Sequence, residues 1–284
     1  MQLPSTVAAV LGRDRGEARE PRTVLITGAA SGLGLELARE FLAGGDRVIC
    51  TDLYPEAPAA VHSLDGDWTY LQLDVTSDLA WEAASLAVTK LDILVCNAGI
   101  AVGGRIDKTS MDTWQHAIDI NLLGIVRGCR TFVPKLPRGG QVVITASAAG
   151  LIHGPYMSTY NATKAGAVAI AETLDAELRP RGITTSVICP QFFRSGLADS
   201  LTGDDADADS MARVLLGRTR LTSELIAKRA HRAIAAKRLV ITPDAAATFL
   251  WYSKRYARVP YLLGVRAVGR GIERKNAEAQ ANSQ

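Results

Sequence analysis

The sequence predicts an α/β domain of the doubly wound type, in which helices cover both faces of a parallel sheet. Short aliphatic runs alternate with longer helical stretches along most of the 284 residues. The short runs are apolar at successive positions and rich in β-branched residues, which is typical of parallel strands buried on both faces. Since no repeat or Pro/Ser-rich linker divides the chain, we expect one domain over residues 21–241, between an N-terminal extension (1–20) and a C-terminal extension (242–284).

The candidate strands are seven aliphatic runs: Thr23–Thr27, Arg47–Thr51, Thr69–Leu73, Ile93–Cys96, Gln141–Ala146, Thr184–Cys189 and Arg238–Ile241. The helical segments between them have helical apolar spacing or Ala-rich composition: Leu33–Leu42, Asp78–Thr89, Met111–Phe132 and Tyr156–Leu178. Ser77 is a candidate N-cap for the second of these helices, and Pro180 with Gly182 ends the fourth. Because ligands bind beyond the carboxyl ends of parallel strands in this architecture, the residues that follow each strand are the candidate site residues.

A glycine-rich turn, Thr27-Gly28-Ala29-Ala30-Ser31-Gly32-Leu33-Gly34, joins the first strand to the first helix. Glycine allows a tight turn close to a pyrophosphate, and the helix start offers free N–H groups. One such match is weak evidence, but its place at the first strand-to-helix junction favours a dinucleotide site. Asp52 follows the second strand, where a carboxylate can bind an adenosine ribose, although taken alone it also fits a turn cap. Since neither Ser31 nor Leu53 is basic, NAD is favoured over NADP.

Short turns follow the third and fourth strands. They read Asp74-Val75 and Asn97-Ala98-Gly99, and each alone is explained as a turn. Because small residues let the backbone pass close to a nucleotide, both turns are candidate cofactor contacts.

Tyr160 and Lys164 are the candidate catalytic pair. They lie four residues apart on a predicted helix and therefore on one face. An ammonium near a phenol is expected to lower the pKa of the phenol, which suits a general acid/base for an alcohol or ketone. Ser147 follows the fifth strand and can donate to a substrate oxygen, and Asn121 is a polar residue in an apolar stretch of the preceding long helix. A lone Y-x-x-x-K would be explained as a surface pair, but here it accompanies the other strand-end motifs.

This combination resembles the short-chain dehydrogenase/reductase family. The matching pieces cover roughly residues 20–240: TGAASGLG (27–34), Asp52, Asp74-Val75, CNAG (96–99), Asn121, Ser147, YNATK (160–164) and CPQFFRS (189–195). The resemblance implies a single Rossmann-type domain with a seven-stranded parallel sheet and an oxidoreductase that uses NAD(P). It also implies homodimers or homotetramers built by packing of the Met111–Phe132 and Tyr156–Leu178 helices.

The resemblance further implies a catalytic tetrad. Tyr160 passes a proton to or from the substrate oxygen, and Lys164 lowers the pKa of Tyr160 and binds the nicotinamide ribose. Ser147 holds the substrate oxygen, and Asn121 supports a water that relays protons from Lys164. The nicotinamide carries the hydride.

The segment after the sixth strand departs from the family pattern. Gln191 stands where the family has Gly, and Gln does not adopt the unusual backbone angles open to Gly. We therefore expect a differently shaped loop beside the nicotinamide, with Pro190, Phe193 and Ser195 as cofactor contacts. Ser195 replaces a Thr and can still bond the carboxamide or a phosphate, while Cys96 replaces an Asn at the end of the fourth strand.

The substrate is expected to bind over Ser147, against residues 148–159 and the segment after Ser195. The first stretch is mostly apolar, so it predicts a lipophilic secondary alcohol or ketone: steroid-like, terpenoid or long-chain. The segment Gly196–Leu216 contains an acidic run at 203–209 and is either a lid or a solvated loop. Arg194 and Arg213 leave an acidic substrate open. The candidate substrate contacts are Ser147, Ala149, His153, Tyr156, Tyr160 and Gln191.

Several other classes are disfavoured by composition. The four cysteines lie far apart without a CxxC pair or Cys/His cluster, which argues against a metal site or disulfide scaffold and favours a cytoplasmic protein. No run approaches the roughly 18 uncharged apolar residues that span a membrane, and the start of the chain lacks a secretory signal. We find no nucleic-acid-binding module.

The C-terminal extension is basic and rich in aromatic residues. Residues 217–284 contain 14 basic and 4 acidic residues, whereas residues 1–216 contain 18 basic and 25 acidic residues. Mixed aromatic and basic residues are typical of a helix lying on an anionic membrane, so a peripheral membrane contact is one interpretation. The other, which we favour, is that the aromatics pack on the domain or a partner subunit.

Two alternatives to an alcohol dehydrogenase or ketone reductase remain. A dinucleotide-binding sensor or scaffold without activity would need none of the tetrad residues. An epimerase or dehydratase of nucleotide sugars would need a larger C-terminal substrate domain than the roughly 40 residues after the last strand.

Overall fold

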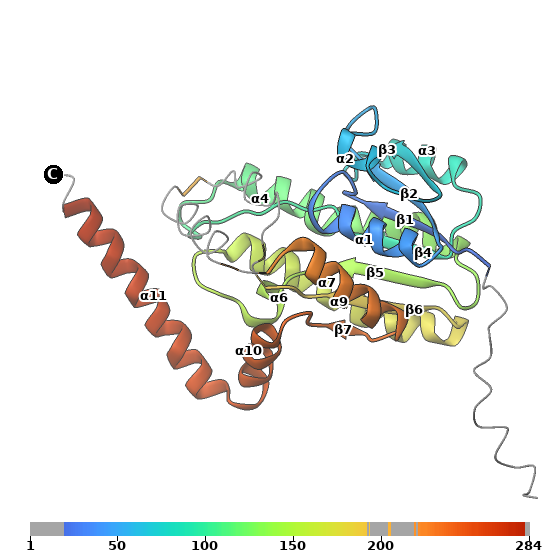
Figure 1. The fold of residues 1–284 in the computed structure, drawn as a ribbon. Coiled ribbons are helices and arrows are strands. Elements are labelled where there is room, and N and C mark those ends of the chain that lie inside the picture. Colours follow the sequence, from blue (N-terminus) through green and yellow to red (C-terminus); the bar gives the residue numbers. More distant parts are fainter. Residues whose placement is uncertain (1–19, 192, 194–203, 206–218, 220, 282–284) are drawn as a thin grey trace, which may run out of the picture.

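The computed structural model describes residues 20–191, 193, 204–205, 219 and 221–281, with side chains in the last helix described as far as Arg274. Within these residues, seven parallel strands form one sheet in the order β3-β2-β1-β4-β5-β6-β7 (Figure 1). The strands are β1 (Thr23–Thr27), β2 (Arg47–Asp52), β3 (Trp68–Gln72), β4 (Ile93–Cys96), β5 (Gln141–Thr145), β6 (Thr184–Ile188) and β7 (Val240–Ile241). The strand order reverses between β1 and β4, which is where doubly wound sheets bind ligands. The predicted fold class is confirmed.

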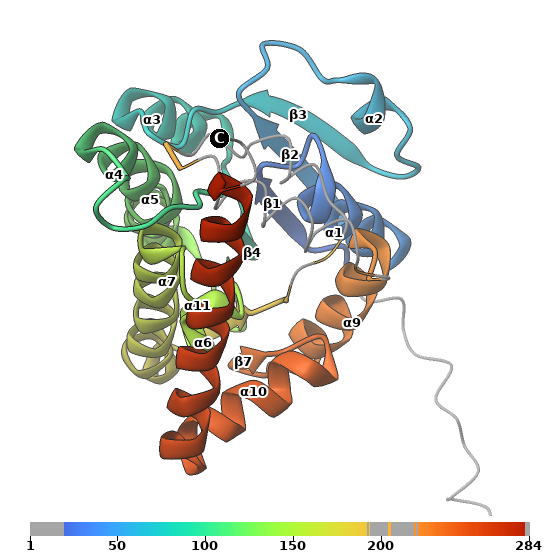
Figure 2. The same ribbon diagram turned by 90° about the vertical axis from the view of Figure 1, so that its left-hand side faces the viewer.

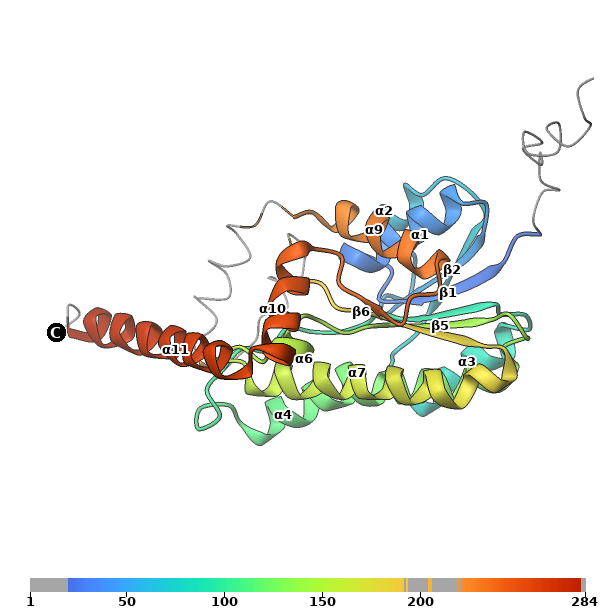
Figure 3. The ribbon, with the colours of Figure 1, turned by 90° about the horizontal axis from the view of Figure 1, so that it is seen from below.

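Helices cover both faces of the sheet (Figure 3). One face packs on α1 (Gly32–Ala43), α2 (Ala59–His62) and α9 (Ser223–Ala235). The other carries α3 (Asp78–Ala87), α4 (Met111–Ile118), the π-helical turn η2 (Asp119–Leu123), α5 (Gly124–Phe132) and α7 (Ser158–Leu178). Three short elements complete this layer: η3 (Val133–Lys135), α6 (Ala149–Ile152) and η4 (Arg179–Arg181). Two apolar cores therefore hold the sheet, one on each face.

The strands are buried as predicted, except at one edge. All residues of β1 and β4 are buried, because both strands lie in the middle of the sheet. The prediction of burial on both faces was wrong for β3, which is an edge strand and is only half-buried. It also begins one residue earlier than predicted, at Trp68.

The two longest predicted helices differ from the helices in the structure. The single helix predicted over 111–132 is interrupted by η2, which contains Asn121. The helix predicted from Tyr156 begins at Ser158, because Tyr156 has a left-handed backbone (φ 63°) that a helix excludes. By contrast, Ser77 caps α3 as predicted, since its hydroxyl accepts a hydrogen bond of 3.2 Å from the Ala80 N–H.

The C-terminal extension is helical. α10 (Ala245–Tyr256) packs beside α6, and α11 (Arg258–Ala281) projects beyond the sheet domain (Figures 1 and 3). In Figure 2, which views the molecule from that side, α11 lies in front of the domain. Asp244 caps α10 by accepting a 2.7 Å hydrogen bond from the Ala247 N–H. No helix of the described residues has the length and apolar content that crossing a membrane requires.

Candidate active site

A cavity of about 480 Å³ lies at the carboxyl ends of the strands, where the strand order reverses. It is lined by most of the predicted site residues: Gly28, Ser31, Gly32, Leu33, Asp52, Leu53, Asp74, Val75, Asn97, Ala98, Gly99, Ser147, Ala149, Tyr160, Lys164, Pro190, Gln191 and Phe193. The structure thus brings the glycine turn and the Tyr–Lys pair to one cavity.

Four predicted residues lie outside the lining. Gly34 and Asn121 lie beneath it, while His153 and Tyr156 face the C-terminal extension. Ser195 lies outside the described residues, as do Arg194 and Arg213.

The glycine turn has the close approaches that require glycine. Gly28 has φ +65°, and a Cβ on it would lie 2.9 Å from the Ala98 Cα. A Cβ on Gly34 would lie 2.1 Å from the Gly28 carbonyl oxygen, so no side chain fits there. α1 begins at Gly32, and the Ser31 side chain does not cap it. The first N–H groups of α1 can therefore receive a phosphate.

The Asp52 carboxylate is fixed at the rim of the cavity by backbone donors. Its Oδ2 accepts a 3.0 Å hydrogen bond from the Ala30 N–H, and its Oδ1 accepts a 2.8 Å bond from the Leu53 N–H. Each carboxylate oxygen can accept a second hydrogen bond, so Asp52 can also bind ribose hydroxyls.

Asn97 braces three strand ends, a role that the sequence did not reveal. Its Nδ2 donates to the carbonyls of Thr27 (3.0 Å) and Gly28 (3.2 Å), and its Oδ1 accepts from Thr145 Oγ1 (3.0 Å). The side chain therefore holds the glycine turn against β4 and β5.

Tyr160 and Lys164 lie on one buried face of α7, with exposed fractions of 8% and 4%. The Lys164 Nζ lies 5.7 Å from the Tyr160 ring centroid and donates a 3.1 Å hydrogen bond to the Thr145 carbonyl. Ser147 Oγ accepts a 3.1 Å hydrogen bond from the Ala149 N–H, which orients the hydroxyl beside the phenol.

The electrostatics of the pair differ from the expectation. Burial raises the pKa of Tyr160, and a hydrogen bond with Ser147 opposes that rise. Burial lowers the pKa of Lys164 to about 8. The expected lowering of the Tyr160 pKa by the ammonium is therefore wrong, because burial dominates and it is Ser147 that opposes the rise.

Asn121 is fully buried and bonds to the backbone after β4. Its Oδ1 accepts a 2.9 Å hydrogen bond from the Ile100 N–H, and its Nδ2 donates a 3.0 Å bond to the Ile100 carbonyl. A Cβ on Gly99 would lie 2.9 Å from the Asn121 Oδ1 and 3.2 Å from the Lys164 Nζ. Gly99 therefore lies between the Asn121 amide and the Lys164 ammonium. A side chain at this position would displace one of the two groups.

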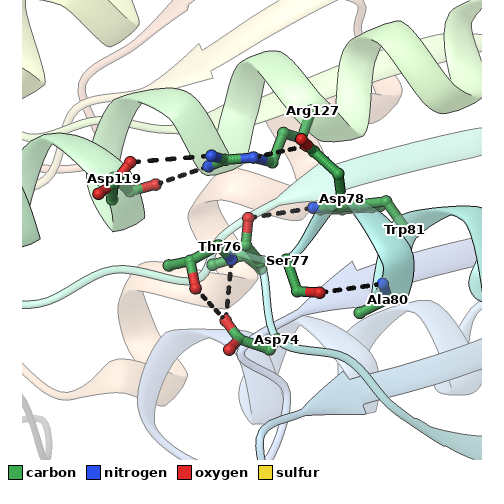
Figure 4. A network of polar contacts seen from close by, with 9 residues as sticks. Asp74, Thr76, Ser77, Asp78, Ala80, Trp81, Asp119 and Arg127 are labelled. Atoms are coloured by element: carbon green, nitrogen blue, oxygen red, sulfur yellow. Dashed lines mark hydrogen bonds and ion pairs between the residues drawn. The ribbon is translucent and has the colours of Figure 1, made fainter.

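An arginine ties the π-helical turn to the start of α3 (Figure 4). The Arg127 guanidinium donates a 2.9 Å hydrogen bond to the Asp78 carboxylate and a 3.4 Å bond to the Asp119 carbonyl. Its Nη2 also lies 3.7 Å from the Asp119 carboxylate. None of these contacts has a sequence signal, because the three residues meet only in the folded chain.

The loop after α6 is held by the C-terminal extension. The Lys254 ammonium donates to the Leu151 carbonyl (2.6 Å) and lies 2.7 Å from the His153 Nδ1. The Tyr261 hydroxyl donates to the Ile152 carbonyl. Burial, and next the Lys254 charge, lower the pKa of His153, so the imidazole is neutral near pH 7. His153 is thus a loop-fixing residue, and Ile152, Gly154 and Met157 line the cavity instead.

Two residues of the acidic run lie within the described residues and are bound to the segment after β4. The Asp205 carboxylate accepts hydrogen bonds from Arg105 Nε (2.7 Å) and Nη2 (2.9 Å). The Asp204 carboxylate accepts a 2.8 Å bond from the Ser110 N–H. Asp205 is therefore buried against this segment, whereas Asp204 is bound to it but stays exposed.

Several residues that line the cavity were not predicted from the sequence. His116 on α4 and Ile120 on η2 reach the cavity from the long helical segment, and Ile100 and Val102 reach it from the segment after Gly99. The segment after β4 could have been suspected, because it continues a strand-end turn. His116 carried no such signal.

The chain is similar in sequence to known dehydrogenases. Residues 22–206 match the family model described as short chain dehydrogenase. The 2-dehydro-3-deoxy-L-rhamnonate dehydrogenase (NAD(+)) of Sphingomonas sp. (strain SKA58) is 35% identical over 211 residues, covering 72% of this chain and 84% of that protein. The 3beta-hydroxysteroid dehydrogenase 1 of Eggerthella lenta is 31% identical over 211 residues, covering 69% and 80%.

A solved structure has the same fold. It is a short chain dehydrogenase/reductase from Burkholderia phymatum in complex with NAD, with a TM-score of 0.77 and 26% sequence identity. The match covers 83% of this chain and 93% of that one.

Proposed function

Since the chain belongs to the short-chain dehydrogenase family, we propose that it transfers a hydride between NAD and a lipophilic secondary alcohol or ketone. One observation carries this proposal: Tyr160, Ser147 and Lys164 line the same cavity as the glycine turn and Asp52. A nucleotide held by the turn and the substrate oxygen held by Ser147 would then share one space.

The proton chemistry follows from these side chains. When bound, NAD supplies or accepts the hydride. In oxidation, the Tyr160 phenolate takes the hydroxyl proton of the alcohol, and in reduction the phenol returns it to the carbonyl oxygen. Ser147 donates a hydrogen bond to the same oxygen and so holds it beside the phenol.

Lys164 would bind the nicotinamide ribose. Its Nζ is already fixed by the Thr145 carbonyl, which leaves further N–H donors for the ribose hydroxyls. The Asn121 amide lies on the other side of Gly99 from the same ammonium. We propose that this amide supports the water through which Lys164 exchanges protons with solvent.

The preference for NAD rests on Asp52. A fixed carboxylate at the ribose position repels a 2′-phosphate, and the flanking Ser31 and Leu53 carry no positive charge. We expect Asp52→Ser with Leu53→Arg to shift the ratio of kcat/KM for NAD over NADP by about 10²-fold or more towards NADP. An unchanged ratio would contradict the role of Asp52.

The proposed lipophilic substrate is supported by the lining. Ile100, Val102, Ile152, Met157 and Phe193 supply apolar side chains. A hydroxysteroid dehydrogenase is among the relatives, which agrees with a steroid-like substrate. A sugar-acid dehydrogenase is another relative and makes a hydroxy acid the second candidate. Within the described lining only Lys164 and His116 can carry a positive charge for a carboxylate, which favours the first candidate.

One experiment tests the activity. NADH formation is followed with a panel of lipophilic secondary alcohols and small hydroxy acids, for the native protein and for Tyr160→Phe. We expect turnover of the alcohols, a loss of about 10³-fold or more in the variant, and NAD affinity that stays within about twofold. Turnover of hydroxy acids alone would overturn the substrate class. Native protein that binds NAD but turns over nothing would favour a sensor or scaffold.

The remaining proposals concern assembly and location. We propose that the enzyme is a homodimer or homotetramer that packs through the α4–α5 and α7 surfaces, as the family resemblance suggests. We also propose that it acts in the cytoplasm, which agrees with its four free, buried cysteines. Light scattering of the purified protein tests the first of these, and a monomer would contradict it.

A further inference from the structure

The corner between α10 and α11 exposes a group of large apolar side chains, here called the corner patch. Its members are Phe249, Tyr252, Tyr256, Val259, Leu262 and Leu263. Phe249 is 71% exposed and Tyr256 is 76% exposed, although large apolar side chains are usually covered when they gather in sequence. Tyr252 and Tyr256 stack with ring centroids 5.9 Å apart, so these two rings form one aromatic surface within the patch.

The corner patch is separate from the side of these helices that packs on the domain. On α11 the half-buried residues recur at Tyr261, Val265, Gly269 and Ile272, which form one helical stripe. A Cβ on Gly269 would lie 4.0 Å from the Pro155 Cβ, so this stripe faces the loop after α6. On α10, Trp251 packs against the core. One side of these helices therefore packs on the domain, and a second apolar side stays exposed to solvent.

Exposed arginines surround the corner patch. Arg255 and Arg258 lie at the corner, and Arg266, Arg270 and Arg274 follow along α11. The Arg255 guanidinium lies 6.0 Å from the Tyr256 ring centroid. Residues 242–284 contain seven basic and three acidic residues, so the extension has an excess of positive charge.

We propose that the corner patch docks on the surface of an anionic lipid bilayer. Tyrosine and phenylalanine insert at the headgroup level, and arginines around them contact lipid phosphates. The positive charge favours a bilayer over a second copy of the chain as the partner. A two-fold contact between two corner patches would bring the same arginines together, and these would repel one another. The helices are amphipathic rather than spanning, so the contact is peripheral.

The position of the patch gives the contact a consequence. Lys254 and Tyr261 come from the same two helices and hold the loop that lines the cavity. A docked corner would therefore place the substrate side of the cavity near the bilayer. This consequence rests on the proposed function, whereas the docking itself does not.

Co-sedimentation of the full chain with vesicles tests the docking. The vesicles are phosphatidylcholine alone, or phosphatidylcholine with phosphatidylglycerol. The test variant is Phe249→Ser/Tyr256→Ser/Leu263→Ser. The control is Leu79→Ser/Leu86→Ser/Ile106→Ser, which removes similarly exposed apolar side chains on α3 and in the segment after β4. A charge variant, Arg258→Gln/Arg266→Gln, tests the basic rim.

We expect the native chain and the control to bind the anionic vesicles and to be released by high salt. The patch variant should lose about tenfold or more of this binding, and the charge variant several-fold. No binding by the native chain, or equal binding by the patch variant, would overturn the proposal. A patch variant that changes the oligomeric state in light scattering would also overturn it, in favour of a second copy. Because the readout needs no turnover, it stands apart from failure of the proposed activity.

Discussion

The Lys164 ammonium lies 5.7 Å from the centroid of the Tyr160 ring, one turn away on the same buried face of α7. Burial disfavours charge on both groups, since it raises the pKa of Tyr160 and lowers that of Lys164 to about 8. The pair is therefore poised for proton exchange but needs polar partners to reach its ionised form. Ser147 is the partner that the structure supplies to Tyr160.

Removing Ser147 should shift the pH dependence of oxidation. The rate of alcohol oxidation is expected to rise with pH as Tyr160 loses its proton. Because the hydrogen bond with Ser147 lowers the Tyr160 pKa, Ser147→Ala should move this rise to higher pH and lower kcat by about 10²-fold. Profiles of kcat/KM against pH measure the shift. Ser158→Ala is the control, because its buried hydroxyl has no hydrogen-bond partner among the residues that the structure describes. A shift of the rise to lower pH in Ser147→Ala would contradict the assignment.

Lys164 should make stability depend on pH. Its pKa is about 8 in the folded chain against an ordinary 10.5, so between these values the unfolded chain binds more protons. Lys164 should therefore contribute a rise in stability from about pH 8 to 10.5, on the order of 3 kcal/mol. The buried thiols of Cys50 and Cys189 oppose it above pH 9, because burial raises their pKa to about 12. The contribution of Lys164 is measured by urea unfolding without nucleotide, as the free energy of unfolding of the native chain minus that of Lys164→Met. This difference should rise with pH, while the exposed-site control Lys228→Met follows the native chain. A difference that stays constant with pH would contradict the linkage.

Arg127 should act on catalysis through the position of Asn121. Its contacts with Asp78 and Asp119 hold the π-helical turn that contains the amide. We expect Arg127→Leu to lower kcat by about tenfold while the Kd for NAD stays nearly constant, because the displaced group serves proton exchange rather than nucleotide binding.

The control for Arg127 is Arg47→Leu, which removes an exposed pair with Asp67 at the edge of the sheet. Such exposed pairs contribute little to stability, so this control should leave kcat unchanged. Equal losses in both variants, or a loss of NAD affinity in Arg127→Leu, would show that the arginine has no positioning role.

The fold and most of the site could be predicted because their signals are local. A buried β-branched run such as Thr23–Thr27 marks a strand by composition alone, and Gly28 follows it directly. Tyr160 and Lys164 share a face because four residues make about one helical turn. Each of these inferences depends on residues that are close in sequence, and such residues are also close in the folded chain.

The rest depends on contacts between distant residues. The direction of the Tyr160 pKa shift is set by burial, which no spacing reveals. The role of Asn97 depends on carbonyls 69 and 70 residues away. His153 lies in the stretch after Ser147 and was therefore predicted to contact the substrate. Its imidazole instead contacts the Lys254 ammonium, 101 residues further along the chain. Such pairings are fixed by tertiary packing rather than by local pattern.

The hydrogen bonds from the C-terminal helices to the loop after α6 should tune substrate binding. Tyr261 and Lys254 hold the carbonyls of Ile152 and Leu151, and Ile152 also lines the cavity. Tyr261→Phe with Lys254→Met should free the loop and raise KM for the alcohol several-fold, with the Kd for NAD unchanged, because the nucleotide side of the cavity is built from other strands. Tyr252→Phe is the control, since its side chain is exposed away from the loop. Steady-state kinetics together with NAD titration separate the two effects. A KM equal to that of the native chain, or a matching loss of NAD affinity, would show that the extension does not shape the substrate side.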